Sequence, residues 1–248
     1  MNNYEFYVLS GNTIVAKWEN KTLTVFKENL LPLYLKQHPN AEHWIASRAI
    51  DSHRANARLL KKALRLKEKD DLSTALYVNA ATITDNYWIK PLDSDLTYQD
   101  VRFTDDYFSV LALKGSYSSF NRVANSKRTK TPELTNIGSF EKCWKLIDGK
   151  WWMYKSATHD ELFSELFIYH LGKELEMNMA VYKRGDKCIK SLDYNGPCNL
   201  DHGIEKMREH GIMRLTKGRS ANYVIQNVHV GIQSKGSHRG SPRGEKSK

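Results

Sequence analysis

The stretch GSFEKCWKLIDGKWWMYK, residues 138–155, decides the predicted fold of this 248-residue chain. Two aromatic-rich segments flank Asp148-Gly149, a dipeptide that favours a type I′ hairpin turn because such a turn needs positive φ at both central positions. Side chains alternate between the two faces of a strand, so Trp151, Met153 and Lys155 are expected to share one face. The pattern predicts an antiparallel hairpin whose second strand ends in a lysine, and this lysine is a candidate phosphate ligand.

The segment after the hairpin is predicted to be a helix with one buried face. Thr158 and Glu161 have the spacing of a capping box, in which each side chain accepts a hydrogen bond from the backbone N–H of the other residue. Glu165 lies on the flank of the expected buried face, where its carboxylate can face the sheet that carries Lys155. The residues of that face recur at three- and four-residue spacing, and they are Leu162, Phe163, Leu166, Phe167, His170, Leu171 and Leu175.

Lys155 and Glu165 admit two interpretations. In an ordinary hairpin packed on an amphipathic helix, both would be surface residues. In the small lobe of a protein kinase they would form a pair, because that lobe needs a flexible loop over the phosphates of ATP, a lysine on the α- and β-phosphates, and a glutamate that holds the lysine. Spacing alone favours the ordinary hairpin, since short motifs often match by chance.

Three segments carry a resemblance that favours the second interpretation. They are KCWKLIDGK (142–150), SELFIYHLGKEL (164–175) and, upstream, TDNYWIK (84–90). In this order, within a likeness that covers most of residues 50–200, they resemble the HipA-like serine/threonine kinases of bacteria. The resemblance implies a small lobe made of an antiparallel sheet and one packed helix, ATP and Mg²⁺ as cofactors, and phosphoryl transfer to a protein serine or threonine.

The resemblance also implies a nucleotide site. Lys155 is its nucleotide lysine and Glu165 is the helix partner of that lysine. Gly138 and Ser139 belong to its phosphate loop. Two further strands are expected on either side of residues 184–186, and the second leads into the place of the hinge that binds adenine, which is occupied by Ser191, Leu192 and Asp193.

Two features depart from the family pattern. Glu176 stands where glycine is expected after the helix, and a positive φ at this position would cost on the order of 1 kcal/mol. Residues 202–248 contain no aspartate, whereas a kinase needs one aspartate as the base and another, with an asparagine, to hold Mg²⁺. The chain is therefore expected to be a catalytically incomplete fragment that has no catalytic residue or metal ligand and does not phosphorylate protein.

The predicted organisation is α+β and has four parts. Residues 1–113 form an N-terminal α+β region with several helices, 114–136 a polar linker and mobile loop, 137–201 the kinase-like small lobe, and 202–248 an irregular, disordered basic tail. Within the first part, residues 4–26 are expected to form three short strands, and helices are expected around 33–35 and over 41–48, 52–67 and 72–80, with Ser52 and Asp71 as caps of the last two.

Charge and cysteine content limit the class of partner. The net charge is +10, of which residues 202–248 carry +7, so the folded part is only weakly basic. The three cysteines lack CxxC spacing and are expected to be free thiols in a reducing cytoplasm. The sequence shows neither an apolar run of about 20 residues nor a signal peptide, so no membrane partner is expected.

Two alternatives to a nucleotide-dependent enzyme stay open. One is a non-catalytic module that contacts a partner protein through the underside of the lobe. The other is weak, non-specific nucleic-acid binding by residues 202–248, since such basic segments contact phosphates in a salt-dependent way. The helices within 52–80 are basic, as in a helix-turn-helix, but the second is mostly apolar, which favours a packed helical subdomain over DNA reading.

Overall fold

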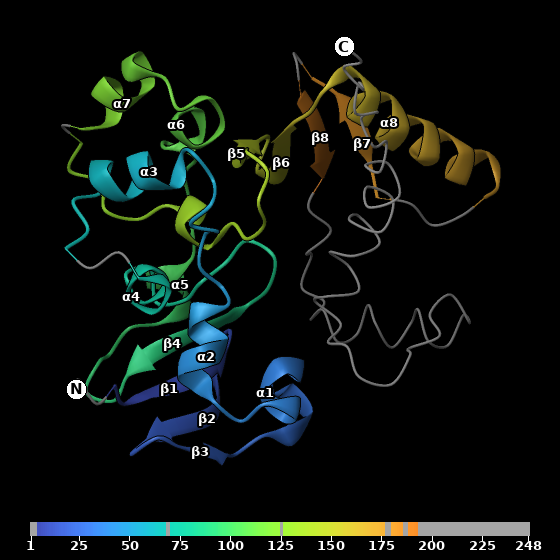
Figure 1. Cartoon of the computed structure of the whole chain (residues 1–248). Helices are drawn as coiled ribbons and strands as arrows, with labels where there is room; N and C mark the ends of the chain where they lie inside the picture. Colours follow the sequence, from blue (N-terminus) through green and yellow to red (C-terminus); the bar gives the residue numbers. More distant parts are fainter. Residues whose placement is uncertain (1–3, 68–69, 125, 177–179, 186–187, 193–248) are drawn as a thin grey trace, which may run out of the picture. The chain divides into compact units, whose positions relative to one another are not determined.

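The computed structural model describes residues 4–67, 70–124, 126–176, 180–185 and 188–192, which belong to one compact unit. Within these ranges the chain has eight α-helices, two 3₁₀ helices and two four-stranded antiparallel sheets (Figure 1). The predicted α+β class is confirmed. No helix in the described ranges is both long enough and apolar enough to cross a bilayer. The predictions for Asp193 and for the tail, residues 202–248, lie outside the described residues.

The first sheet is a meander with one added strand. Strands β1 (Phe6–Ser10), β2 (Thr13–Glu19) and β3 (Thr22–Val25) confirm the three that were expected, and β4 (Tyr87–Pro91) pairs with β1 to give the order β3-β2-β1-β4. The sequence pattern does not predict β4, because its first three residues are buried in succession and show no alternation. The indole N–H of Trp88 donates to the carbonyl of Gly11 at 2.6 Å and ties β4 to the β1–β2 turn.

Three helices share a hydrophobic core with this sheet. They are α1 (Leu33–Gln37), α2 (Ala41–Ala46) and α4 (Asp71–Leu76), and the 3₁₀ helix η1 (Glu28–Leu30) precedes α1. The predicted cap of α4 is wrong by one residue, because the Asp70 carboxylate accepts the hydrogen bond from the Ser73 N–H, at 2.9 Å. Helix α4 also ends before the predicted Ala80, since Asn79 and Ala80 both adopt positive φ.

A second core contains residues of α3 (Ala57–Ala63), α5 (Tyr98–Val101), α6 (Ser109–Lys114) and α7 (Tyr117–Ala124). The predicted start of α3 at Ser52 is wrong. The Asp51 carboxylate instead accepts from the backbone N–H of His53 at 2.8 Å, and the Arg54 guanidinium donates to distant carbonyls. These bonds hold the segment before α3 in turns, so the helix begins at Ala57.

The segment 114–136 differs from the expected mobile linker. It contains α7 and the 3₁₀ helix η2 (Pro132–Thr135), in which Glu133 and Leu134 are completely buried. The backbone N–H of Ile50 donates to the Leu134 carbonyl at 2.7 Å, so η2 is bonded into the interior. The polar composition of this stretch therefore marks its exposed first part and not its end.

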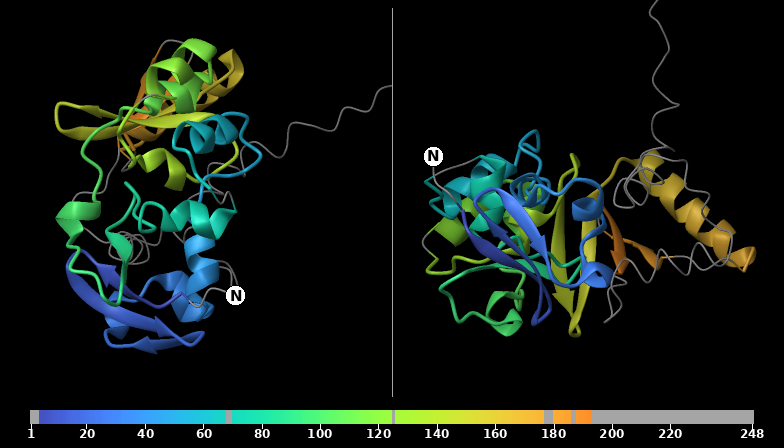
Figure 2. Two further views of the ribbon diagram at one scale, coloured as in Figure 1. Left: turned by 90° about the vertical axis from the view of Figure 1, so that its left-hand side faces the viewer. Right: turned by 90° about the horizontal axis from the view of Figure 1, so that it is seen from below.

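The second sheet contains the predicted hairpin. Strands β5 (Lys142–Ile147), β6 (Lys150–Ser156), β7 (Tyr182–Arg184) and β8 (Cys188–Leu192) have the order β5-β6-β8-β7. Asp148 and Gly149 both have positive φ, 50° and 72°, as a type I′ turn requires. Figure 2 shows this hairpin in two further views, with the β7–β8 pair and α8 (His159–Glu174) next to it.

Helix α8 begins where it was predicted to begin, but far fewer of its apolar side chains are buried than predicted. The capping box is confirmed, because Thr158 and Glu161 exchange both hydrogen bonds. Of the expected buried face only Leu162 is buried, whereas Phe163, Phe167, Leu171 and Leu175 are exposed. The reason is one of size: a 16-residue helix is about 24 Å long. The three-residue strand β7 that it contacts most spans about 10 Å.

Candidate functional site

Lys155 and Glu165 form an ion pair between the second sheet and α8. The Nζ atom of Lys155, one residue before the end of β6, lies 2.8 Å from Oε1 of Glu165, and the two side chains are only 11% and 17% exposed. The predicted pairing is confirmed. Both side chains are therefore less exposed than the ordinary-hairpin interpretation expects.

Two aromatic side chains lie next to this pair. The Lys155 ammonium lies 4.7 Å from the centre of the Phe140 ring, which comes from the segment before β5 and is itself partly exposed. Tyr182 approaches from β7, and burial together with the negative charge of Glu165 raises the pKa of its phenol. Rings and ions thus create a partly desolvated site in which charge interactions are stronger than in water.

The Gly138 turn lies beside the same strands. Gly138 has φ of 104°, and a Cβ atom built there would lie 2.6 Å from Nζ of Lys142. A larger residue would therefore be strained and would push against the ammonium group. Ser139 is exposed. Of the two predicted loop residues, the structure brings Gly138 against a cation and leaves Ser139 at the surface.

Lys142 is a site residue that sequence reasoning missed. It lies directly opposite Lys155 in the β5–β6 ladder, and its side chain is partly buried. Burial and the positive charges of Arg54 and Lys155 lower the pKa of its ammonium to about 8. A signal for it exists in the sequence: a two-residue turn at Asp148-Gly149 fixes the register, and counting back from the turn places residue 142 opposite residue 155.

A buried polar network supports β5 from behind. Arg54 donates to the carbonyls of Asn136 and Lys142 at 2.9 and 2.7 Å. The Glu133 carboxylate accepts from the Trp144 backbone N–H at 2.8 Å and from the Asn136 amide at 3.1 Å, and burial raises its pKa to about 7. These residues come from segments far apart in the chain, so no local spacing could have predicted them.

The predicted hinge residues separate onto the two faces of the sheet. Ser191 lies opposite Met153, which shares a face with Lys155, so Ser191 is on the side of the ion pair. Leu192 lies opposite Trp152, on the other face. The structure therefore brings Ser191 to the face of the candidate site and places Leu192 away from it.

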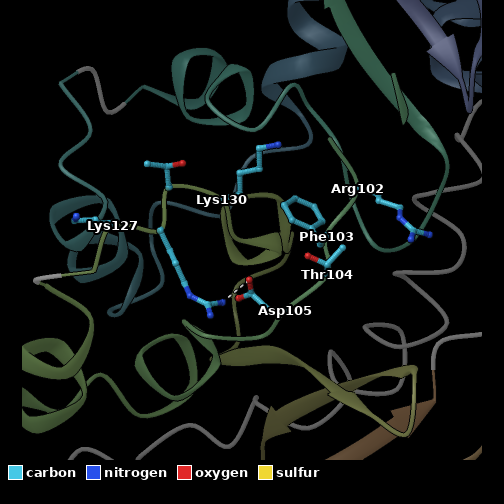
Figure 3. A pocket seen from close by; sticks show the side chains of 8 residues that line it. Arg102, Phe103, Thr104, Asp105, Lys127 and Lys130 are labelled. Atoms are coloured by element: carbon cyan, nitrogen blue, oxygen red, sulfur yellow. Dashed lines mark ion pairs between the residues drawn. The ribbon is translucent and has the colours of Figure 1, made fainter. Parts of the chain in front are cut away.

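A separate pocket of about 230 Å³ contains none of the predicted site residues. Residues 102–105 and 127–130 line it, and four of the eight are basic (Figure 3). Two of these cations are already engaged: Arg128 pairs with Asp105 at 2.5 Å, and the Lys130 ammonium donates to the Asp100 carbonyl. The other two, Arg102 and Lys127, lie at opposite ends of the pocket in Figure 3. The two remaining cations of this basic pocket therefore do not converge on one point.

The charged residues around Lys155 are chemically suited to phosphate groups. Lys142 and Lys155 lie opposite each other in the β5–β6 ladder, and two neighbouring ammonium groups suit phosphate oxygens. Across the described ranges, no group of three or more histidine, cysteine or acidic side chains could hold a metal. No protein-family model matches the chain, and a search of curated proteins finds no match to it.

Proposed function

We propose that the second sheet and α8 form the nucleotide-binding part of a HipA-like kinase, in which Lys155 contacts the phosphates of ATP. The observation that carries the proposal is the 2.8 Å ion pair between Lys155 and Glu165. A nucleotide lysine must be held in place by a carboxylate from a helix and remain close to a mobile or glycine-containing turn. The Gly138 turn and the partly exposed Phe140 supply the second requirement.

The interior position of the pair also supports this proposal. Two ions taken out of water need good geometry to offset their desolvation, and a purely structural ion pair gains little over apolar packing. Here Phe140 covers the ammonium with its ring and Ser191 shares the same face of the sheet. A nucleotide phosphate would gain charge-assisted hydrogen bonds from Lys155 in this desolvated setting.

The proposal concerns nucleotide binding. Phosphoryl transfer to a protein serine or threonine, the activity of the family, needs a base and metal-held charge neutralisation. No described residue is assigned either role. The purified chain is therefore still expected to bind ATP without labelling a protein substrate.

Isothermal titration calorimetry with ATP tests the proposal. The natural chain should bind, and Lys155→Met should weaken binding by about 10- to 100-fold, because a charge-assisted contact to phosphate is lost. Lys150→Met is the matched control, since Lys150 is an exposed lysine on the same strand. Circular dichroism must show that both variants are folded. Equal ATP affinity in the natural chain and in folded Lys155→Met, or no binding by the natural chain, would refute the proposal.

A further inference from the structure

Lys142 is a cation that lacks a counterion among the described residues. Neither a hydrogen bond nor an ion pair of its ammonium group occurs in that part of the chain, although the side chain is partly buried. Its cross-strand neighbour is another lysine, Lys155, and like charges placed directly opposite each other destabilise a sheet. The free protein therefore has an arrangement of charge that an anion would stabilise.

The charged groups around Lys142 do not neutralise it. Arg54 and Lys155 add positive charge from the segment before α3 and from β6. The acids that face it are Glu133 and Asp51, and both are engaged elsewhere: Glu133 accepts from Trp144 and Asn136, and Asp51 accepts from the backbone and ring of His53. The Glu165 carboxylate is held by Lys155.

The backbone near Lys142 is a glycine turn that lies directly against the ammonium group. The ammonium lies beside Gly138, where a Cβ atom would be only 2.6 Å away, so the turn has no side chain over the cation. The neighbouring residue, Ser139, is exposed. A turn without a side chain next to a cation is an arrangement in which phosphate oxygens can approach both backbone and ammonium.

We propose that Lys142 is a second phosphate-binding residue, which contacts a different phosphoryl group from Lys155, so that the site takes a nucleoside di- or triphosphate. This inference rests on the proposed nucleotide-binding function and names its ligand class. Lys142 and Lys155 come from adjacent strands, whose backbones are about 4.8 Å apart, so two successive phosphoryl groups can each find an ammonium. A nucleoside monophosphate would satisfy only one of them.

Titration with ATP, ADP and AMP at pH 7 tests this assignment on the full chain. Lys142→Met should lower the affinity for ATP and ADP by about tenfold or more, whereas its affinity for AMP should change less than about threefold. Lys142→Arg should restore ATP and ADP binding, because it keeps the charge. Lys155→Met should weaken binding of all three. Since Lys142 has no partner among the described residues, Lys142→Met should fold at least as stably as the natural chain.

The pH dependence of ATP affinity distinguishes a phosphate-binding role of Lys142 from a purely structural role, which would not produce such a dependence. The ammonium of Lys142 loses its proton near pH 8 in the free protein, so ATP affinity should fall between pH 7.5 and 9.5. The same titration of Lys142→Arg should be nearly flat over this range. Equal ATP affinity in Lys142→Met and the natural chain, with Lys155→Met impaired, would refute the role of Lys142 and leave the nucleotide site intact. Absence of nucleotide binding by the natural chain would remove both proposals.

Discussion

The carboxylate of Glu133 accepts a 2.8 Å hydrogen bond from the backbone N–H of Trp144, and this bond joins η2 to β5. Its second oxygen accepts from the Asn136 amide at 3.1 Å. Arg54 donates to the carbonyl of Asn136, so the three residues form one buried unit. This buried unit is bonded to β5, the strand that carries Lys142. The ionisation state of Glu133 therefore affects the candidate site.

The first prediction concerns the pH dependence of stability. Burial raises the pKa of Glu133 to about 7, from 4.5 in the unfolded chain, so the folded state binds more protons between these values. The free energy of unfolding should therefore fall as pH rises from about 4.5 to 7, by about 3 kcal/mol in all. Urea unfolding at pH 5 and at pH 7.5 measures the difference.

Glu133→Gln is the control for this prediction, because glutamine has the same shape and no charge. The free energy of unfolding of Glu133→Gln should fall less between pH 5 and 7.5 than that of the natural chain, by about 2–3 kcal/mol. Asp51, Asp70 and Asp100, whose pKa values are lowered by hydrogen bonds, lose their contribution only as pH falls below about 3.8, outside this window. Parallel curves for the two proteins would show that Glu133 does not titrate there.

The second prediction concerns Arg54, which is 2% exposed. Arg54→Met should lower the free energy of unfolding by about 3–5 kcal/mol, because it leaves the carbonyls of Asn136 and Lys142 without their donor and removes the cation beside Glu133 and Glu141. Arg58→Met, four residues on and exposed, should change it by less than about 0.5 kcal/mol. Similar values for the two variants in urea unfolding would contradict a structural role for the network.

The hairpin and the ion pair could be predicted because their determinants are local. Asp148-Gly149 fixes the turn and the register, and the Thr158–Glu161 capping box fixes the start and phase of α8. Together they place Lys155 and Glu165 on facing surfaces. The same register also places Lys142, which local patterns alone do not mark as important because lysine is usually an exposed residue.

The burial of η2 and the exposure of α8 could not be predicted, because both depend on distant partners. Glu133 lies in a stretch rich in serine, threonine and lysine, and its burial depends on hydrogen bonds from Asn136 and Trp144 and on the charge of Arg54, 79 positions earlier. The three- and four-residue spacing of apolar residues in α8 correctly predicts a helix. This spacing contains no information about the size of the surface against which the helix packs. Local sequence therefore predicts the type of secondary structure but not how deeply that element is buried.

The third prediction compares two leucines of the helical segment. Leu162 is 8% exposed and Leu175 is 63% exposed. Leu162→Ala should lower the free energy of unfolding by about 2–3 kcal/mol, through lost burial and a residual cavity. Leu175→Ala should change it by less than about 0.5 kcal/mol. If Leu175→Ala proved as costly as Leu162→Ala, the second leucine would have to be covered in solution.

The last prediction concerns the end of α8, where Glu176 adopts φ of 57°. This left-handed conformation brings Cβ of any residue but glycine too close to the backbone, at a cost on the order of 1 kcal/mol. Glu176→Gly should therefore raise the free energy of unfolding by roughly 0.5–1 kcal/mol, although glycine also gains entropy in the unfolded chain. The backbone N–H of Glu176 already donates to the Lys173 carbonyl at 3.0 Å, and this bond survives the substitution.

Lys173→Gly is the matched control, because it introduces the same residue three positions earlier, inside α8. There glycine should lower the free energy of unfolding by roughly 0.5–1 kcal/mol, since it adds backbone freedom to a helical position with negative φ. Urea unfolding of both variants at one pH gives the two differences. Opposite signs are expected, because both side chains are exposed and the backbone conformation is the main difference between the two positions, although Lys173→Gly also removes a cation–π contact with Tyr169. A loss of stability in Glu176→Gly equal to that in Lys173→Gly would mean that residue 176 is not held at positive φ in solution.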